Sequence, residues 1–283
     1  MSTSISIFQR LSRHAVAGCL LSTMVLLLQS GCTERKKVAS DQTAGIGVTA
    51  DATQPAASMN TLTDQEKDDG WVLLFDGTGT SAWRGYNQTA FPGSGWVAKD
   101  GLLMMEATGR EEEGYGGDII TKEQYENFEF KVDFKLSPNA NGGILYSVKE
   151  EKGKPVWQNA SEYQLLDNEG YEKKKKYVMD NHRTGDNFDL LASTANNLKP
   201  VGEWNQAMLR VKAGQVQHWL NGQKVLEYTL WTPEWKAAVK TSTFADYPGS
   251  GMAKQGHVGL QDWGHQIWYR NIKIRNLEGE REG

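Results

Sequence analysis

Phe128-Glu129-Phe130-Lys131-Val132-Asp133-Phe134-Lys135-Leu136 alternates apolar and charged residues from end to end. Successive side chains of a β-strand point to opposite faces of a sheet. The alternation therefore predicts a strand over 128–136 that has one face buried and the other in water.

Strand signals continue on the C-terminal side of this segment. Ala207–Val211 is a short alternating stretch, and Trp268–Ile274 is expected to be the closing strand. Val216–Leu220 and Lys224–Leu230 flank Asn221-Gly222, the strongest short-range signal for a hairpin. Thirty glycines and ten tryptophans also favour a turn-rich β protein. We therefore expect an all-β fold, a two-sheet antiparallel jelly-roll sandwich.

Composition and motifs exclude several classes of function. The chain has 39% hydrophobic and 23% charged residues, as ordinary globular proteins do, and no apolar run is long enough for a polytopic membrane protein. A net charge of −4 without a dominant basic block disfavours nucleic-acid binding. We find no phosphate loop, dinucleotide fingerprint or GxSxG elbow. His182, His218, His257 and His265 lack zinc-ligand spacing, so no metal site is predicted.

The N-terminus has the pattern of an export signal. Two arginines precede the apolar segment Ala15–Leu28, and Gln29-Ser30-Gly31-Cys32 follows it. This pattern predicts a signal peptide over 1–31. It also resembles a bacterial lipobox, in which Cys32 would carry a lipid and become the mature N-terminus. An ordinary cleaved signal peptide is the alternative, although it would leave one free thiol in an oxidising compartment.

The rest of the chain divides at an abrupt change of composition. Residues 32–69 have few large apolar side chains, so we expect a disordered tether there. The folded domain is expected over 70–277, followed by a tail at 278–283. The protein would thus be exported to the periplasm or cell surface. Because Thr33 rather than Asp follows Cys32, we expect an outer-membrane lipoprotein in a Gram-negative cell.

The first candidate site lies in Glu162-Tyr163-Gln164-Leu165-Leu166-Asp167. On a strand, Tyr163 and Leu165 would point into the core while Glu162 and Gln164 share the other face. Asp167 would lie at the strand end. A carboxylate beside an amide can hydrogen-bond a sugar and can also move a proton. The alternative is a solvated outer face.

Three further segments carry polar groups. Asn141-Gly142-Gly143 indicates either a tight turn or a close backbone approach to a ligand. His182 could act as a base and Arg183 could hold an oxyanion, although a loop with these residues is often merely solvated. Gln261-Asp262-Trp263 suits a carbohydrate, because planar polar groups bind hydroxyls and an aromatic ring stacks on the sugar. A satisfied turn is the alternative there.

Together these segments resemble the bacterial 3-keto-disaccharide hydrolase family from about Gly70 to Leu277. The matching stretches are Gly70–Gly77, Asp118–Tyr125, Glu162–Asp167, His182–Gly185, Gly202–Asn205, His218–Gly222, Gly256–Gly264 and Arg270–Ile274. The family fold is similar to that of concanavalin A-like lectins and glucanases. The chain departs from the family pattern at Gly142 in place of Ser, at Ser147 in place of Arg and at Trp263 in place of His. His265 lies two residues after Trp263.

The resemblance implies cleavage of an oligosaccharide or keto-sugar by removal of the C2 proton beside a C3 ketone. Such an enzyme needs a base, an oxyanion donor and an acid. The implied catalytic residues are Glu162 as base and His182 or Asp262 as acid. The implied substrate-binding residues are Asn141, Tyr146, Gln164, Asp167, Arg183, Gln261, Trp263 and His265. No cofactor is required on this scheme, and a structural calcium ion is left open.

Two other functions fit the same residues. One is a non-catalytic carbohydrate-binding lipoprotein, and the other is a conventional glucanase-like glycosidase. For any of the three, we expect Glu162, Gln164, His182, Gln261 and Asp262 to line one concave cleft.

The membrane anchor is tested by Cys32→Ser. This variant should leave the membrane fraction and change its processing, because serine lacks the thiol that accepts the lipid. Cell fractionation and mass spectrometry of the mature N-terminus measure both effects. A Cys32→Ser protein that stays membrane-bound and is processed as before would contradict the lipoprotein hypothesis.

Overall fold

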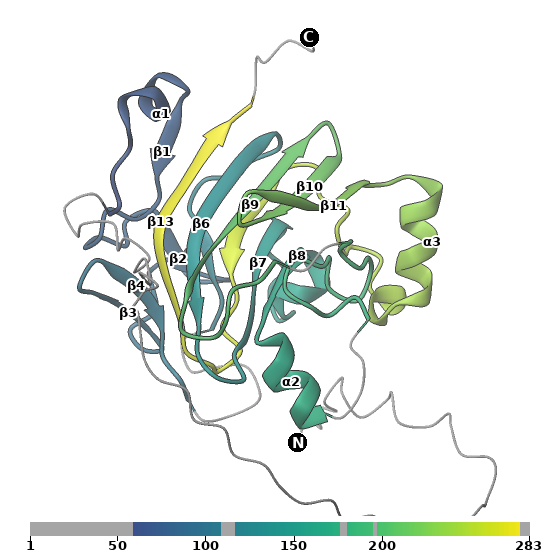
Figure 1. Cartoon of the computed structure of the whole chain (residues 1–283). Helices are drawn as coiled ribbons and strands as arrows, with labels where there is room; N and C mark the ends of the chain where they lie inside the picture. The colour runs from purple at the N-terminus through teal and green to yellow at the C-terminus, as the bar shows by residue number, and fades with distance from the viewer. Residues whose placement is uncertain (1–58, 109–116, 176–179, 195–196, 278–283) are drawn as a thin grey trace, which may run out of the picture. The chain divides into compact units, whose positions relative to one another are not determined.

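The computed structural model describes residues 59–108, 117–175, 180–194 and 197–277. Within them, two antiparallel β-sheets lie against each other, as Figure 1 shows. The predicted fold class, an all-β two-sheet sandwich, is confirmed. The predicted signal peptide, the lipidation at Cys32, residues 33–58 of the tether and the tail lie outside the described residues.

The larger sheet is built around β6 (Phe128–Leu136), the strand predicted from the alternating sequence. Its strand order is β11-β10-β9-β6-β13-β4-β3, and β1 also pairs with β13. The other strands are β1 (Trp71–Leu73), β3 (Trp96–Lys99), β4 (Leu102–Met105), β9 (Trp204–Lys212), β10 (Gln215–Leu220), β11 (Gln223–Thr229) and β13 (Ile267–Asn276).

The smaller sheet has the order β2-β5-β12-β7-β8. Its strands are β2 (Trp83–Gly85), β5 (Ile119–Thr121), β7 (Asn141–Val148), β8 (Ser161–Leu166) and β12 (His257–Leu260). Strand β12 lies between β5 and β7, although more than a hundred residues separate it from either strand in the chain. This long-range pairing joins the last part of the chain to the middle of the sheet.

Helices are short and lie at the margins of the sheets (Figure 1). They are α1 (Asp64–Asp68), α2 (Asn168–Lys175), α3 (Pro233–Thr241) and the 3₁₀ turns η3 (Val156–Asn159) and η4 (Thr243–Asp246). None of the described helices is long and apolar enough to cross a membrane.

The predicted hairpin turn is confirmed in detail. Strands β10 and β11 pair from Leu220 and Gln223, so Asn221 and Gly222 alone form the loop. Both have positive φ, 49° and 80°. A two-residue type I′ turn requires left-handed backbone at both positions, which Asn and Gly adopt most readily.

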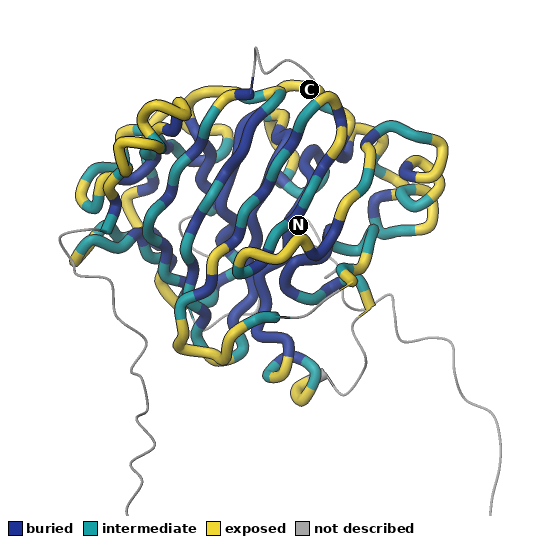
Figure 2. The backbone as a smooth tube through the Cα atoms, turned by 45° about the horizontal axis from the view of Figure 1, so that its top comes forward, coloured by how far each residue is buried: buried dark blue, intermediate teal, exposed yellow. Residues whose placement is uncertain are grey.

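The core lies between the two sheets. Phe130 and Phe134 of β6 meet Ile144, Tyr163 and Leu165 of the smaller sheet in one buried cluster. Figure 2 shows these strands as mainly buried while the connecting turns are exposed. Burying a large apolar side chain stabilises a fold by about 1.5–3 kcal/mol, so this layer is the main stabilising term.

The domain begins before the predicted boundary at Gly70. Asn60 and Asn271 exchange hydrogen bonds in both directions, each side-chain oxygen accepting from the other residue's backbone N–H at 2.7 and 2.8 Å. Asn271 lies in a bulge of β13 and has a φ of 53°. The side chain of Asn60 thus replaces ladder bonds that the bulge interrupts. The tether prediction for 59–69 is therefore wrong, because a polar segment can be ordered by hydrogen bonds without burying apolar surface.

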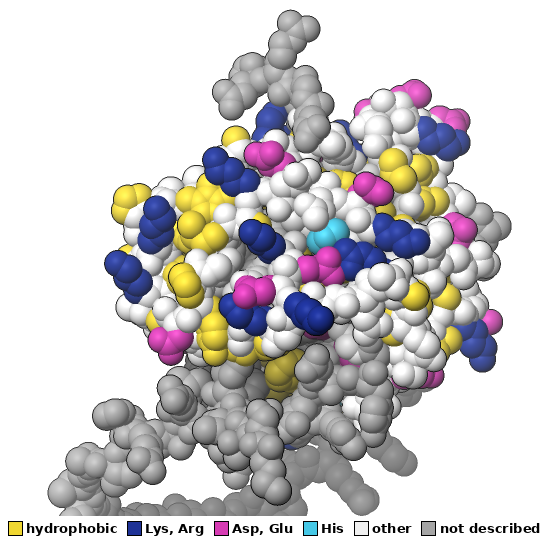
Figure 3. Space-filling model, turned by 180° about the vertical axis from the view of Figure 1, so that it is seen from behind, with side chains coloured by type: hydrophobic (Ala, Val, Ile, Leu, Met, Phe, Trp, Pro, Cys, Tyr) yellow, Lys and Arg dark blue, Asp and Glu magenta, His cyan; other side chains and the backbone are white. Residues whose placement is uncertain are grey.

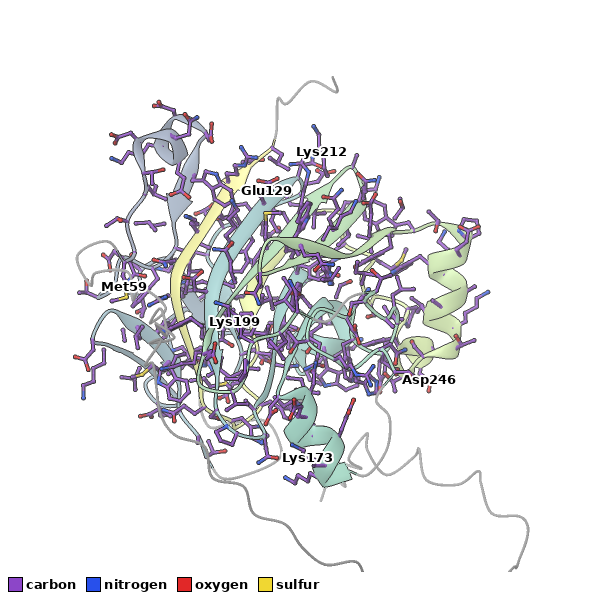
Figure 4. The ribbon with its side chains drawn as sticks, viewed as in Figure 1. Met59, Glu129, Lys173, Lys199, Lys212 and Asp246 are labelled. Atoms are coloured by element: carbon purple, nitrogen blue, oxygen red, sulfur yellow. The ribbon has the colours of Figure 1, made fainter. Side chains whose placement is uncertain are left out.

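One charged residue of β6 is buried despite the predicted wet face. Glu129, labelled in Figure 4, is 7% exposed and forms ion pairs with Arg210 and Arg275. Burial alone would raise the pKa of Glu129, but hydrogen bonds from the two arginines outweigh it and lower the pKa. The charged face of this strand therefore depends on cations from its two neighbouring strands.

We predict that Glu129→Gln destabilises the domain by about 2 kcal/mol at pH 7. Breaking a buried ion pair typically costs about 3–5 kcal/mol, and partial exposure of both arginines lowers that figure. Since the folded pKa is depressed, this contribution is present above the unfolded pKa and is lost as pH falls through the folded value. Urea unfolding at pH 7 and pH 3 measures it; an equal loss at both would contradict the ion-pair explanation.

Candidate active site

The outer face of the smaller sheet carries the polar residues of the first candidate segment. Tyr163 and Leu165 point into the core as predicted. Glu162 and Gln164 therefore project from the opposite face of β8, but they are only 7% and 2% exposed. The solvated alternative is thus wrong, because other parts of the chain cover this face.

Strand register places four residues in one row across this outer face. Leu260 pairs with Ile119 of β5, and the next residue, Gln261, donates its backbone N–H to the carbonyl of Gly143. Gly143 in turn pairs with Gln164 of β8. Asp118, directly before β5, lies opposite Gln261 by the same register. The row Asp118–Gln261–Gly143–Gln164 thus spans four adjacent strands.

Glu162 lies over Gly143. A Cβ atom built on Gly143 would stand 2.4 Å from Oε1 of Glu162 and 2.7 Å from its Cδ, far inside contact distance. The side-chain amide of Gln261 donates to Oε2 of Glu162 at 3.4 Å. The close approach predicted from Asn141-Gly142-Gly143 is therefore real, but a carboxyl group of the chain itself makes it.

This environment favours the protonated form of Glu162. Burial raises the pKa of its carboxyl to about 8, and the negative charge of Asp118 adds to the shift. The hydrogen bond from Gln261 offsets part of it. In the part of the chain that the structure describes, no arginine, lysine or histidine contributes to the shift. A carboxyl with a pKa near neutrality and no cationic partner is typical of a general acid or base.

A cavity of about 290 Å³ lies beside Asp118. It is lined by Tyr86, Gln88, Gly117, Asp118, Lys154, Pro155 and Val156. Tyr86 packs on the apolar cluster that Val156 forms with Ile120 and Leu145. An aromatic ring, a carboxylate and a cation around one hollow are suited to binding a sugar. Figure 3 shows a face of the domain on which acidic and basic side chains are mixed.

Two predicted residues hold the site together. Gln164 donates its side-chain amide to Oδ1 of Asn141 at 2.8 Å and to the carbonyl of Gly142 at 2.9 Å. These bonds clamp β7 to β8 beside Glu162. The predicted substrate contacts Asn141 and Gln164 thus lie in the candidate site and bind each other.

Asp262 lies at the site but is bonded to the backbone. Its oxygens accept from the N–H groups of Gly117 and Gly264 at 3.1 and 3.0 Å. Its own N–H donates to Oδ1 of Asp118 at 2.9 Å. Asp262 therefore fixes the turn that carries Gln261 and orients Asp118.

His182 lies on the segment that runs beside β8, along the edge of this strand that does not pair with β7. The backbone N–H of Phe188 donates to the carbonyl of Glu162 at 3.1 Å, and the His182 ring stacks on Phe188 with centroids 4.7 Å apart. Nε2 of His182 is 2.9 Å from Oδ1 of Asp189. The described contacts bring His182 close to the strand of Glu162 but do not join the two side chains.

Arg183 and Asp167 are engaged elsewhere. The Arg183 guanidinium donates to Oε1 of Glu172, and the residue lines a separate cavity of about 210 Å³. Asp167 accepts from the N–H groups of Asn139 and Gly170. It borders a larger hollow of about 420 Å³, whose lining includes Lys173 and Lys199, both labelled in Figure 4.

Tyr146 does not lie in the site. It projects from the inner face of β7, is fully buried, and its hydroxyl hydrogen-bonds Tyr228 and His218. The predicted substrate contact is therefore wrong, because alternation along β7 places residue 146 on the core side. Trp263 and His265 follow Asp262, and Nε1 of Trp263 and Nδ1 of His265 are both buried without a hydrogen-bond partner.

Sequence reasoning missed Asp118 and Tyr86 as site residues. Each lies next to a short strand, Asp118 at the start of the matching stretch Asp118–Tyr125, and only strand pairing brings Asp118 to Gln261. Across the described residues, no cluster of three or more His, Cys, Asp or Glu side chains could hold a metal ion.

The chain is similar in sequence to known proteins over most of its length. Residues 70–275 match the model of the 3-keto-alpha-glucoside-1,2-lyase-like domain. A 3-keto-disaccharide hydrolase of Bacteroides thetaiotaomicron is 32% identical over 92% of this chain and 97% of its own length.

Solved structures show the same similarity. A Parabacteroides distasonis protein provisionally named a glycosyl hydrolase is 30% identical with a TM-score of 0.70, over 78% of this chain and all of that one. A second protein of that organism, named in the same way, is 27% identical with a TM-score of 0.55, over 73% of this chain and 99% of that one.

We predict that Glu162→Gln stabilises the domain at alkaline pH. The folded pKa of Glu162 is about 8, above its ordinary 4.5. Its carboxyl therefore contributes stability that is fully present below the unfolded pKa and is lost as pH rises through 8. The amide avoids that loss, so the gain should be near zero at pH 4.5 and should reach a few kcal/mol at pH 9, at about 1.4 kcal/mol per pKa unit.

Urea unfolding of Glu162→Gln against wild type, from pH 4.5 to 9, measures this gain. Glu129→Gln is the matched control, because Glu129 is equally buried but paired with arginines, so its substitution should destabilise. A loss of stability in Glu162→Gln at pH 9 would show that the Glu162 carboxylate is stabilised in the folded state.

Proposed function

The chain belongs to the family of 3-keto-alpha-glucoside-1,2-lyase-like domains, and we propose that it cleaves 3-keto-disaccharides and related 3-keto-glycosides. The observation that carries this proposal is the buried carboxyl of Glu162, which lies over Gly143 and has no cationic partner among the described residues. The membership of the chain in this family and the cavity beside Asp118 support a sugar substrate.

The proposed reaction begins with proton removal from C2 of the sugar ring. A ketone at C3 acidifies this hydrogen, so a carboxylate can take the proton and leave an enolate on C2, C3 and the C3 oxygen. The enolate then re-forms the ketone and a C1–C2 double bond as the C1–oxygen bond breaks. Water finally adds its oxygen to C1 and a proton returns to C2, which completes hydrolysis.

Glu162 suits the role of this base. A general base works best when its pKa lies near the working pH, and burial brings Glu162 to about 8. Gln261 donates its side-chain amide to Glu162, and this amide has a second N–H that could bind a ketone or hydroxyl oxygen. This chemistry requires no carboxylate to stabilise an oxocarbenium ion, unlike that of ordinary glycosidases.

We also propose that the domain works outside the cytoplasm, tethered through a lipid on Cys32, and that it needs no cofactor. The N-terminal pattern supports the first statement, and the second follows because a carboxyl base acting on an already acidic hydrogen requires no redox group.

The function is tested with a 3-keto-glycoside and its unoxidised parent. Wild type should release the leaving group from the keto compound, and its kcat/KM should rise as the pH approaches about 8, because Glu162 then begins to lose its proton. Glu162→Gln should still bind the sugar but turn it over about 10²–10⁴-fold more slowly, because an amide cannot accept the C2 proton.

The parent glycoside is the control, since its C2 hydrogen is not acidic and it should be nearly inert. Fast cleavage of the parent would indicate a conventional glycosidase instead. Sugar binding without turnover of either compound would indicate a carbohydrate-binding protein. Full activity of Glu162→Gln would exclude Glu162 as the base and make His182 the next residue to test.

A further inference from the structure

We infer that Asp118 is the second catalytic carboxyl of this site: it protonates the leaving oxygen and then accepts a proton from the attacking water. This inference rests on the proposed function and assigns its acid to a residue that the sequence motifs did not indicate.

Asp118 occupies the right place between the hollow and the base. It lines the 290 Å³ cavity together with Tyr86 and Lys154, although only 9% of it is exposed. On its other side it faces Gln261, whose amide bonds Glu162. A sugar bound in the cavity would thus contact Asp118 on the way to Glu162.

The orientation of Asp118 is fixed by the backbone. The N–H of Asp262 donates to Oδ1 of Asp118 at 2.9 Å, and both oxygens of Asp262 are themselves bonded to the N–H groups of Gly117 and Gly264. Holding a reacting group in one orientation contributes to catalysis by lowering the entropy lost on reaching the transition state. The turn after β12 therefore holds Asp118 and the preceding Gly117 in place.

Like charge couples the two carboxyl groups. The charge of Asp118 makes ionisation of Glu162 less favourable, so the two carboxyl groups lie close enough to interact. Two neighbouring carboxyl groups, one ionised and one protonated, can supply the base and the acid that the elimination needs.

The proton transfers balance over the cycle. Glu162 takes the C2 proton while the proton of Asp118 passes to the leaving oxygen as the C1–oxygen bond breaks. Water then enters: its oxygen bonds C1, one of its protons goes to Asp118, and Glu162 returns its proton to C2. Both carboxyls end in their starting states, and one water molecule is consumed.

The two acids suggested by the sequence are less suited to this step. Both oxygens of Asp262 accept backbone N–H groups, so the side chain of Asp262 holds the turn in place. His182 directs Nε2 to Asp189, and its Nδ1 is buried without a partner beside Phe188.

The experiment compares two leaving groups in Asp118→Asn. The amide keeps an oxygen that can accept from Asp262 but cannot supply a proton. For a 3-keto-glucoside with a sugar leaving group, kcat should fall about 10²–10⁴-fold. For the p-nitrophenyl 3-keto-glucoside, whose leaving group departs without protonation, kcat should change only a few-fold. Retained nitrophenyl turnover also shows that the site is folded.

Two matched variants separate the possible roles. Glu162→Gln should lose activity on both substrates, because each needs the C2 proton removed. Asp76→Asn should lose neither, since Asp76 is exposed and only caps a turn.

Equal losses on both substrates, in an Asp118→Asn protein whose circular dichroism and urea unfolding match those of wild type, would overturn the inference and leave Asp118 a structural residue. Unchanged activity on the sugar substrate would overturn it as well. Wild type inert towards both keto-glycosides would instead remove the proposed function on which the inference rests.

Discussion

The absence of a side chain at Gly143 is the constraint on which the candidate site depends. Any Cβ there would collide with the Glu162 carboxyl, so a glycine is what allows this carboxyl to lie flat over β7 and to reach Gln261. Burial in this position removes water from the Glu162 carboxyl and raises its pKa. Geometry and acidity of the base thus have one cause.

The buried glutamates of the two sheets, Glu129 and Glu162, have opposite surroundings. On the larger sheet, Glu129 is surrounded by arginines from neighbouring strands and is kept ionised. On the smaller sheet, Glu162 is equally buried but meets an amide and a second carboxylate, so its ionisation is disfavoured. The first arrangement stabilises the fold, whereas the second opposes it at high pH. Residues that lower stability in this way are commonly retained for function.

Much of the fold was predictable because its signals are local. Alternation over 128–136 predicted β6, and Asn221-Gly222 predicted the β10–β11 turn, since both depend on neighbours in sequence. Glu162 and Gln164 were correctly placed on one face of β8 for the same reason. The hydrogen bonds between Asn60 and Asn271 were not predicted, because they join residues that are distant in the chain.

The sequence by itself determined the family, the strand pattern and the polar residues available for chemistry, since these follow from residue order and period-two alternation. Only the tertiary structure decided which polar residues act together. Strand β12 pairs with β5 and β7, which brings Gln261 between Asp118 and Glu162. Pairing register between strands far apart in the chain is set by the packing of the whole domain. That register converts an ordinary buried glutamate into the candidate base.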